Sequence, residues 1–368
     1  MIQLFEPFIA PEASQRVAEV LKSGWISEGK LVKDFEQSFM QYFDQKACVA
    51  VNSCTSALHL ALILANVKPG DEVILPAQTF VATGIAVLMV GATPVFADID
   101  YETGNISVGD VRQKITDKTK AIIGVDWAGS PCDIEGLLQF RIPVIEDAAQ
   151  AIDAGFRQQD GTFYKVGREA NFTCFSFQAI KQLTTGDGGM LCLGNPYDIF
   201  RAKKLRWFGS RKGANKDRCQ DIVELGYKYN MNDYSAALGL ANIRYVKNNV
   251  THARRIHREY LKGLSGVTGI RFLKEVNESY SSYWFQPILV ETMDAESFVS
   301  RMEDHDIHIS RVDLRIDNNP IFQKADLPNT VKFNQHHVGL PTHHRMSDDD
   351  VQYVIDTIKY VVKFEKEL

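Results

Sequence analysis

The stretch Asn171–Leu193, NFTCFSFQAIKQLTTGDGGMLCL, places one lysine between two apolar runs. The runs Phe172–Phe177 and Met190–Leu193 are rich in aromatic and aliphatic residues, and each predicts a buried strand. Lys181 lies between them, on a turn that ends in Gly186–Gly189. A lysine held between apolar strands loses hydration, which lowers its pKa, and a neutral amine attacks carbonyl groups. Lys181 is therefore a candidate Schiff-base lysine. The alternative is a lysine that extends from a strand end into water.

The length and composition restrict the class of protein. A chain of 368 residues favours two domains, with one large α/β domain as the alternative. Its 45% apolar and 24% charged residues are typical of globular enzymes. The net charge of −5 argues against nucleic-acid binding, which needs a basic face. The sequence has neither a membrane-spanning apolar run nor a signal-peptide pattern. We therefore expect no nucleic-acid partner and no membrane partner.

The cysteines and histidines do not form recognisable metal or disulfide patterns. The six cysteines are scattered without a CxxC pair, which favours a reducing, cytoplasmic compartment. Four histidines form two adjacent pairs on either side of Pro341, and this is not the i, i+4 spacing of a helical zinc pair. We expect no metal site. The residues concerned are Cys48, Cys54, Cys132, Cys174, Cys192 and Cys219, with His336, His337, His343 and His344.

Strand-like and helix-like segments alternate over roughly the first 200 residues, which predicts βαβ units and a largely parallel sheet covered on both faces. The remainder has an α+β pattern. An apolar-periodic helix over 232–246 is expected to join the two parts, so we place a large domain at 1–248 and a smaller one at 249–368. Ligands of such sheets bind beyond the carboxyl ends of the strands.

Several polar and aromatic residues follow predicted strands and are expected to converge at that edge. Thr55 and Ser56 open a helix, where free backbone N–H groups bind anions or are simply capped. Asp147 ends an apolar strand, and it either caps a helix or pairs with a protonated ring nitrogen. Phe80 is placed to stack on a ring, and Gln150 lies beside Asp147. Together with Lys181 and Ser176, these residues match the requirements of pyridoxal 5'-phosphate (PLP).

The chain resembles the DegT/DnrJ/EryC1/StrS family of PLP-dependent sugar aminotransferases over nearly its whole length. The resemblance implies the aspartate aminotransferase type I fold. This fold has a large domain with a mostly parallel seven-stranded sheet flanked by helices, and a smaller α+β C-terminal domain. The segments that carry the resemblance are GWISEGK at 24–30, NSCTSALHLAL at 52–62, PGDEVILPAQTFVAT at 69–83, GATPVFADID at 91–100, EDAAQA at 146–151, FSFQAIKQLTTGDGG at 175–189 and LGYKYNMNDYSAALG at 225–239.

The resemblance implies a role for each site residue. Lys181 would be the catalytic Schiff-base lysine, Asp147 would bind the pyridine nitrogen and Gln150 would contact the ring hydroxyl. Phe80 would stack on the ring. The phosphate would be held by Thr55, Ser56 and Ser176.

Other residues are expected to bind the substrate or the partner chain. Members of the family work as homodimers with shared active sites, and a residue of the loop 226–230 reaches the partner's phosphate. Many members have asparagine where this chain has Lys228, so either the contact is a charged one or the role has moved. Arg211, in the basic stretch Arg201–Arg218, is expected to bind a diphosphate. Trp25, Ser27 and Tyr229 are further candidates for substrate contacts.

The expected reaction is transamination from L-glutamate to a keto-sugar, because relatives that dehydrate sugars carry histidine at the position of Lys181. The TTGDGG sequence at 184–189 resembles the branch that aminates C4. We therefore expect a nucleotide-linked 4-keto-6-deoxyhexose, used in amino-sugar or surface-polysaccharide biosynthesis such as that of lipopolysaccharide O-antigen. The alternatives are a 3-keto nucleotide sugar, an eight-carbon sugar acid, a non-catalytic PLP-binding regulator, or a hydrolase that uses the histidine pairs to bind metal.

Overall fold

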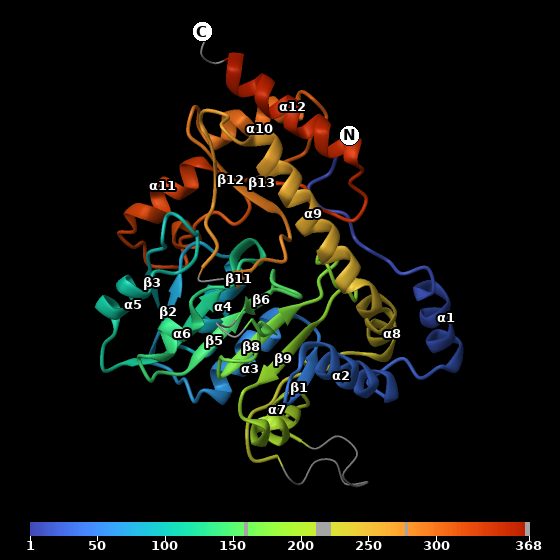
Figure 1. Ribbon diagram of the computed structural model, residues 1–368. Coiled ribbons are helices and arrows are strands. Elements are labelled where there is room, and N and C mark those ends of the chain that lie inside the picture. The colour runs from blue at the N-terminus through green and yellow to red at the C-terminus, as the bar shows by residue number, and fades with distance from the viewer. Residues whose placement is uncertain (158–160, 211–221, 277–278, 365–368) are drawn as a thin grey trace.

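The computed structural model describes residues 1–157, 161–210, 222–276 and 279–364. Its largest sheet has seven strands in the order β1-β9-β8-β5-β4-β2-β3 (Figure 1). The strands are β1 (Cys48–Val51), β2 (Glu72–Pro76), β3 (Thr93–Ala97), β4 (Thr119–Val125), β5 (Val144–Asp147), β8 (Phe172–Ser176) and β9 (Gly189–Leu193).

Most of this sheet is parallel, and β9 is antiparallel to both of its neighbours. In register, Gly189 at the start of β9 lies opposite Val51 and Ser176. The amino end of β9 therefore meets the carboxyl ends of the parallel strands at one edge. This confirms the fold predicted from the sequence, and it places the residues after β1, β2, β5 and β8 along that edge.

Helices cover both faces of the sheet. On one face lie α3 (Cys54–Leu64) and α4 (Val81–Met89). The other face carries α2 (Lys30–Phe43), α5 (Val108–Lys114), α6 (Ile134–Leu138) and α8 (Asp233–Asn242). Phe35, Phe39 and Phe43 recur at helical spacing on α2 and are fully buried against Phe175 and Phe177, so this face of α2 is fixed by aromatic packing. Two further helices, α1 (Ala13–Ser23) and α7 (Ile199–Leu205), pack on α8 and on α3 with β1, respectively.

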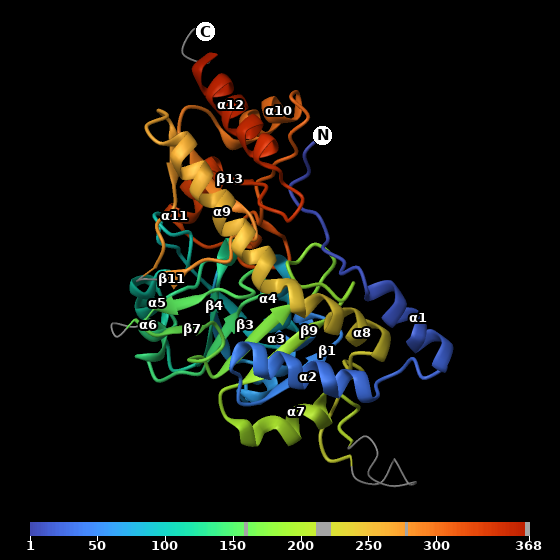
Figure 2. The same cartoon turned by 45° about the vertical axis from the view of Figure 1, so that its right-hand side comes forward.

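The C-terminal part is built on an antiparallel sheet in the order β10-β12-β13, with helices packed around it (Figure 2). Its elements are α9 (Val246–Leu264), β10 (Ile270–Phe272), β12 (Gln286–Val290), α10 (Ala295–Glu303), α11 (Pro328–His336), β13 (His337–Leu340) and α12 (Asp348–Phe364). Ser347 and Asp350 form the predicted capping box of α12, because each side chain accepts the other's backbone N–H. A small sheet joins β6 (Gly155–Arg157), β7 (Phe163–Lys165) and β11 (Ser279–Tyr280).

The two parts are joined by a long helix. We predicted one helix over 232–246, but the structure has α8, a short 3-10 turn and then α9, which is continuous from Val246 to Leu264. Residue 248 therefore lies in the first turn of α9, and the boundary chosen there stays a prediction. The N-terminal segment also pairs with the C-terminal part, since Ile2 bridges Ile307.

Within the described residues, no helix is both long and apolar enough to cross a membrane.

Candidate active site

Lys181 lies on the loop between β8 and β9, at the edge of the large sheet. Its partly buried side chain places Nζ 3.2 Å from the centroid of the Trp284 ring. The indole Nε1 of Trp284 donates to the carbonyl of Ile180 at 2.9 Å, which fixes the ring beside the lysine. Burial lowers the pKa of Lys181 to about 8. The amine therefore has a substantial neutral fraction near physiological pH, as a nucleophile or proton carrier requires.

Asp147 ends β5 and is almost completely buried. The hydroxyl of Thr83 donates to Oδ2 at 2.8 Å, and the backbone N–H of Ala149 donates to Oδ1 at 3.2 Å. Burial raises the pKa of Asp147, while these two donors and Lys181 act in the opposite direction. A buried carboxylate in this setting is suited to pair with a cation that enters the site.

Glu146 has a structural role although it is adjacent to Asp147. Successive residues of a strand point to opposite faces, and Glu146 accepts hydrogen bonds from Gly167 N and Thr173 Oγ1, both at 2.8 Å. Burial raises the pKa of Glu146 to about 7. Only Asp147 of the two carboxylates belongs to the group around Lys181.

Gln150 is held on both sides of its amide. Its Oε1 accepts from the backbone N–H of Ala128 at 2.7 Å, and its Nε2 donates to Oδ2 of Asp313 at 2.6 Å. Asp313 comes from the irregular segment between α10 and α11, far from Gln150 in sequence. Sequence reasoning missed this residue, because no periodicity or motif marks it.

The residues after β1 and at the end of β8 supply hydroxyl groups. Ser53 is the N-cap of α3 and accepts from Ser56 N at 3.1 Å, so Thr55 and Ser56 lie in the first turn of the helix. Ser176 lies opposite Gly189 in register. A Cβ atom at Gly189 would meet the backbone of Ser53 at 2.6 Å, so this close approach requires glycine. The backbone N–H groups at the start of α3 suit a phosphate, whereas the hydroxyl of Ser56 donates to Oδ1 of Asn52 at 2.6 Å within the chain.

Phe80 is the N-cap residue of α4 and is 62% exposed, although Thr79 beside it is buried. An aromatic ring left open at this edge can stack on a planar ligand. This group of side chains therefore fits PLP. It contains an amine with a lowered pKa, a buried carboxylate, an exposed ring and the hydroxyl groups at the start of α3.

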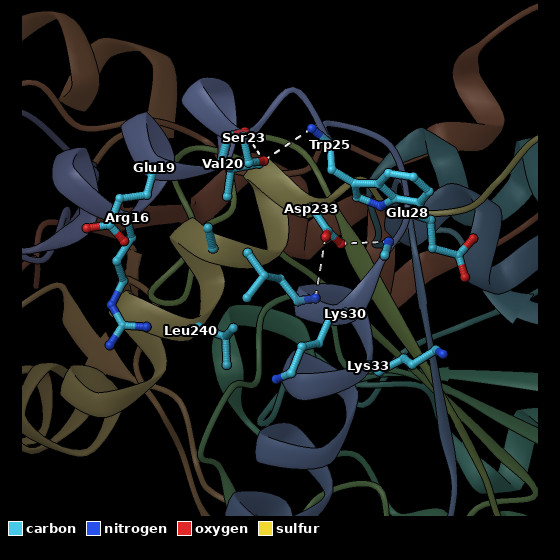
Figure 3. A pocket seen from close by; sticks show the side chains of 13 residues that line it. Arg16, Glu19, Val20, Ser23, Trp25, Glu28, Lys30, Lys33, Asp233 and Leu240 are labelled. Carbon is cyan, nitrogen blue, oxygen red and sulfur yellow. Dashed lines mark hydrogen bonds between the residues drawn. The ribbon is translucent and has the colours of Figure 1, made fainter.

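The predicted substrate residues Trp25 and Ser27 lie elsewhere in the chain, on the loop between α1 and α2. Trp25 is 64% exposed and lines a pocket of about 810 Å³ (Figure 3). Asp233 borders the same pocket and accepts from Gly29 N at 2.8 Å and Val32 N at 3.2 Å, which caps the start of α2. Lys181 lines a separate, smaller pocket with Trp284 and His343.

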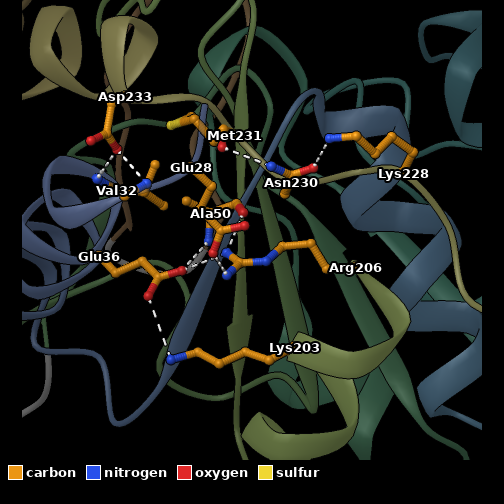
Figure 4. A network of polar contacts seen from close by, with 11 residues as sticks. Glu28, Val32, Glu36, Ala50, Lys203, Arg206, Lys228, Asn230, Met231 and Asp233 are labelled. Atoms are coloured by element: carbon orange, nitrogen blue, oxygen red, sulfur yellow. Dashed lines mark hydrogen bonds and ion pairs between the residues drawn. The ribbon is translucent and has the colours of Figure 1, made fainter. Parts of the chain in front are cut away.

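Tyr229 and Lys228 lie on the loop that pairs with the end of β1 through Asn230 and Val51. The hydroxyl of Tyr229 is 3.0 Å from Nδ1 of the buried His59. Lys228 donates to Oδ1 of Asn230 at 2.7 Å (Figure 4). Within this chain, both side chains are thus held on the α3 and β1 side of the molecule. Arg211 lies outside the described residues.

Three described cations of the basic stretch 201–218 form ion pairs within the chain, namely Arg201, Lys203 and Arg206. Arg201 binds Glu224 at 2.6 Å, and Lys203 lies 3.6 Å from Glu36. Arg206 is almost completely buried and contacts both Glu28 and Glu36 at 2.7 Å (Figure 4). These contacts give the stretch a structural role that the charge pattern alone did not indicate.

Three of the four paired histidines hydrogen-bond to backbone carbonyls. His336 bonds to the carbonyl of Val290 at 2.9 Å, and His343 bonds to that of Gln3 at 3.0 Å. His337 is fully buried and bonds to the carbonyls of Phe333 and Val312. In the part of the chain that the structure describes, no group of three or more His, Cys, Asp or Glu side chains is arranged to hold a metal ion.

Comparison with known proteins decides the family. The profile of the DegT/DnrJ/EryC1/StrS aminotransferase family matches residues 7–359. This chain belongs to that family. GDP-perosamine synthase of Escherichia coli O157:H7 is 31% identical over 375 residues, which cover 97% of each chain. The structure of AtS13 from Actinomadura melliaura has a TM-score of 0.92 and 33% identity, and the match covers 98% of each chain.

A third relative in the DegT/DnrJ/EryC1/StrS family bears on the cofactor. The structure of Spr1654 from Streptococcus pneumoniae, solved in its PLP form, has a TM-score of 0.89 and 29% identity, and the match covers 99% of each chain. As a DegT/DnrJ/EryC1/StrS aminotransferase, the protein is a PLP-dependent enzyme. The roles expected for the individual site residues stay predictions, and Asp313 is a further residue that contacts Gln150.

Proposed function

We propose that the enzyme transfers an amino group from L-glutamate to a nucleotide-linked 4-keto-6-deoxyhexose. The observation that carries this proposal is the environment of Lys181, whose amine lies in a buried site with Asp147 and has a lowered pKa. The choice of sugar is supported by the TTGDGG sequence after the lysine and by the similarity to GDP-perosamine synthase. The product would serve amino-sugar or surface-polysaccharide biosynthesis. We place the reaction in the cytoplasm, in keeping with the free thiols of the five described cysteines.

Different residues of the site would carry out proton transfer and cofactor binding. Bound PLP supplies a protonated ring that accepts the electrons of the bond broken at the amino-acid carbon. Asp147 would keep the ring nitrogen protonated, and Phe80 would orient the ring. Lys181 Nζ would remove the proton from the α-carbon of glutamate and, in the second half-reaction, deliver a proton to the sugar carbon that gains the amine. Thr55, Ser56 and Ser176 would anchor the phosphate.

The test is to measure each half-reaction separately. PLP-loaded enzyme mixed with L-glutamate alone should release 2-oxoglutarate in an amount equal to the number of sites. Adding a nucleotide-linked 4-keto-6-deoxyhexose should then return the cofactor to its starting spectrum. A lack of 2-oxoglutarate release would show that the donor is wrong. Return of the spectrum only with 3-keto sugars or eight-carbon sugar acids would exclude the proposed acceptor.

We further propose that the enzyme acts as a homodimer whose sites combine residues of two chains. Support comes from apolar side chains that are left exposed on α7 and the neighbouring loop segments. Phe200 is 64% exposed, and Val223 and Leu225 are 87% and 74% exposed. Apolar patches of this kind mark interaction sites. The loop that carries Lys228 and Tyr229 continues from this patch, so a second copy seated on it would bring these residues to the partner's site.

Mixed dimers test whether Lys228 acts across the interface. Dimers of one Lys181→Ala chain and one Lys228→Ala chain should regain activity, because one of the two sites then contains both lysines. If Lys228 serves its own chain, neither site is complete. The measurement is transamination after the two variants exchange subunits, with each variant alone as the control. Provided that Lys228→Ala alone is impaired, a mixture no more active than its parents would contradict the shared site.

A further inference from the structure

Asp313 is a second buried carboxylate that acts electrostatically on Lys181, in addition to Asp147. It lies on the segment between α10 and α11, so it reaches Gln150 from the C-terminal part of the chain. Opposite charges in a buried site stabilise each other's ionised forms. Burial raises the pKa of Asp313, and Lys181 acts against this rise more strongly than any other group. Of the three groups that raise the pKa of Lys181, namely Asp313, Cys54 and Asp147, Asp313 has the largest effect.

The backbone of Asp313 is fixed in an unusual conformation. Its φ of 58° lies in the left-handed region, which few residues other than glycine, asparagine and aspartate adopt. Nε2 of the buried Gln78 donates to the carbonyl of Asp313 at 2.6 Å, and Ile316 N donates to the carbonyl of Ala77 at 2.9 Å. These bonds tie the segment to the residues that follow β2. The position of the carboxylate is therefore set by the large sheet.

The carboxylate of Asp313 in turn determines how the amide of Gln150 points. Asp313 Oδ2 accepts one hydrogen of Gln150 Nε2, and Ala128 N donates to Gln150 Oε1. The amide then has one Nε2 hydrogen left to donate. That hydrogen suits an oxygen anion, such as the ring hydroxyl of PLP in its ionised form.

A second carboxylate can also balance the charge of Lys181 when that amine is protonated. PLP with a protonated ring brings one positive charge, which Asp147 is placed to balance. Lys181, when protonated, brings another. We propose that Asp313 is a positioning residue of the transamination site, whose carboxylate orients Gln150 and supplies the negative charge that faces Lys181. This inference rests on the proposed role of Lys181.

Two substitutions separate the charge of Asp313 from its hydrogen bond. Asp313→Asn removes the charge but keeps an oxygen that can accept from Gln150, and asparagine tolerates the left-handed backbone. Asp313→Gly removes both and also suits this backbone. The matched control is Asp326→Asn, which removes a charge from an exposed position on the same segment. Thermal denaturation of each variant checks that it folds.

The first measurement is the pKa of Lys181 in the cofactor-free protein. It is obtained from the rate of acetylation of this lysine across the pH range, quantified by mass spectrometry. Both Asp313 variants should lower this pKa by about one unit, since losing a nearby negative charge disfavours the ammonium form. Asp326→Asn should leave it unchanged. An unchanged pKa in Asp313→Asn, or an equal shift in the control, would overturn the proposed charge role.

The second measurement is the affinity for pyridoxamine 5'-phosphate, which cannot condense with Lys181. Asp313→Gly should weaken this binding by about five- to tenfold, the usual effect of one lost hydrogen bond. The affinity of Asp313→Asn should stay close to that of the unchanged protein. Equal affinity in Asp313→Gly would exclude the orienting role. Neither measurement needs turnover. Failure of the glutamate or keto-sugar experiments would therefore be distinguishable from failure of this inference.

Discussion

Replacing Lys181 with alanine is expected to lower kcat for transamination by at least about 10²- to 10⁴-fold, the usual contribution of a general acid–base residue. The substitution removes the amine that lies over Trp284 and has its pKa lowered to about 8. Without it, no proton carrier of suitable pKa remains at that position. The measurement is steady-state transamination together with the single-turnover release of 2-oxoglutarate, because the same lysine serves both half-reactions.

Two controls distinguish a catalytic loss from a folding defect. A small primary amine added to Lys181→Ala should restore part of the rate, since it can enter the space left by the side chain and carry the proton. Lys359→Ala, at a partly exposed position on α12, should have unchanged kcat. If Lys181→Ala keeps the turnover of the unchanged enzyme, Lys181 has no catalytic role and the proposed mechanism is wrong.

The large sheet could be predicted because its strands are short apolar runs bounded by turn residues. The predicted strands Phe172–Phe177 and Met190–Leu193 each differ by one residue from the observed bounds of β8 and β9. Parallel strands end at a common edge, so the sequence also indicated that Lys181 and Asp147 would meet. That the two residues act together stays a prediction, which is supported by the effect of Lys181 in lowering the pKa of Asp147 against the rise caused by burial.

Two expectations from the sequence differ from the structure, namely the bounds of one helix and the composition of the site. The two differences have different physical causes. The helix predicted over 232–246 is divided, because α8 ends at Asn242, a 3-10 turn follows, and Val246 is buried with Val250 and Ala253 on one face of the next helix, α9. Asp313 could not be found, because its place in the site depends on contacts with residues far away in sequence, such as Gln78 and Gln150.

The sequence pattern also did not show which basic residues form ion pairs inside the fold. The cations at 201–206 suggested a phosphate-binding stretch, but a charge pattern does not show which partners the fold provides. Glu28 and Glu36 come from the loop before α2 and from α2 itself, and they enclose Arg206 once the sheet forms. The resulting contact links α7 to the loop that carries Trp25, next to the pocket of about 810 Å³.

Replacing Arg206 with alanine is expected to lower the free energy of unfolding by about 3–5 kcal/mol, the usual cost of removing one partner from a buried ion pair. Arg206 is only 4% exposed, and its guanidinium donates to Glu28, Glu36 and the carbonyl of Ala50, each at 2.7 Å. Alanine would remove the guanidinium that lies between the carboxylates of Glu28 and Glu36 and would leave Lys203, 3.6 Å from Glu36, as a more exposed cation. Urea denaturation of the two proteins measures the difference.

A surface arginine provides the matched control for this prediction. Arg244 also binds a glutamate, Glu12, at 3.0 Å, but its side chain is 64% exposed. Arg244→Ala should therefore cost less than about 1 kcal/mol, because water solvates the charge that remains. Arg206→Lys should fall between the two alanine variants, since one ammonium group replaces the charge but cannot reproduce the planar contacts to both carboxylates. If Arg206→Ala costs no more than Arg244→Ala, burial does not determine the strength of this contact, and the link between α7 and the Trp25 loop must depend on apolar packing.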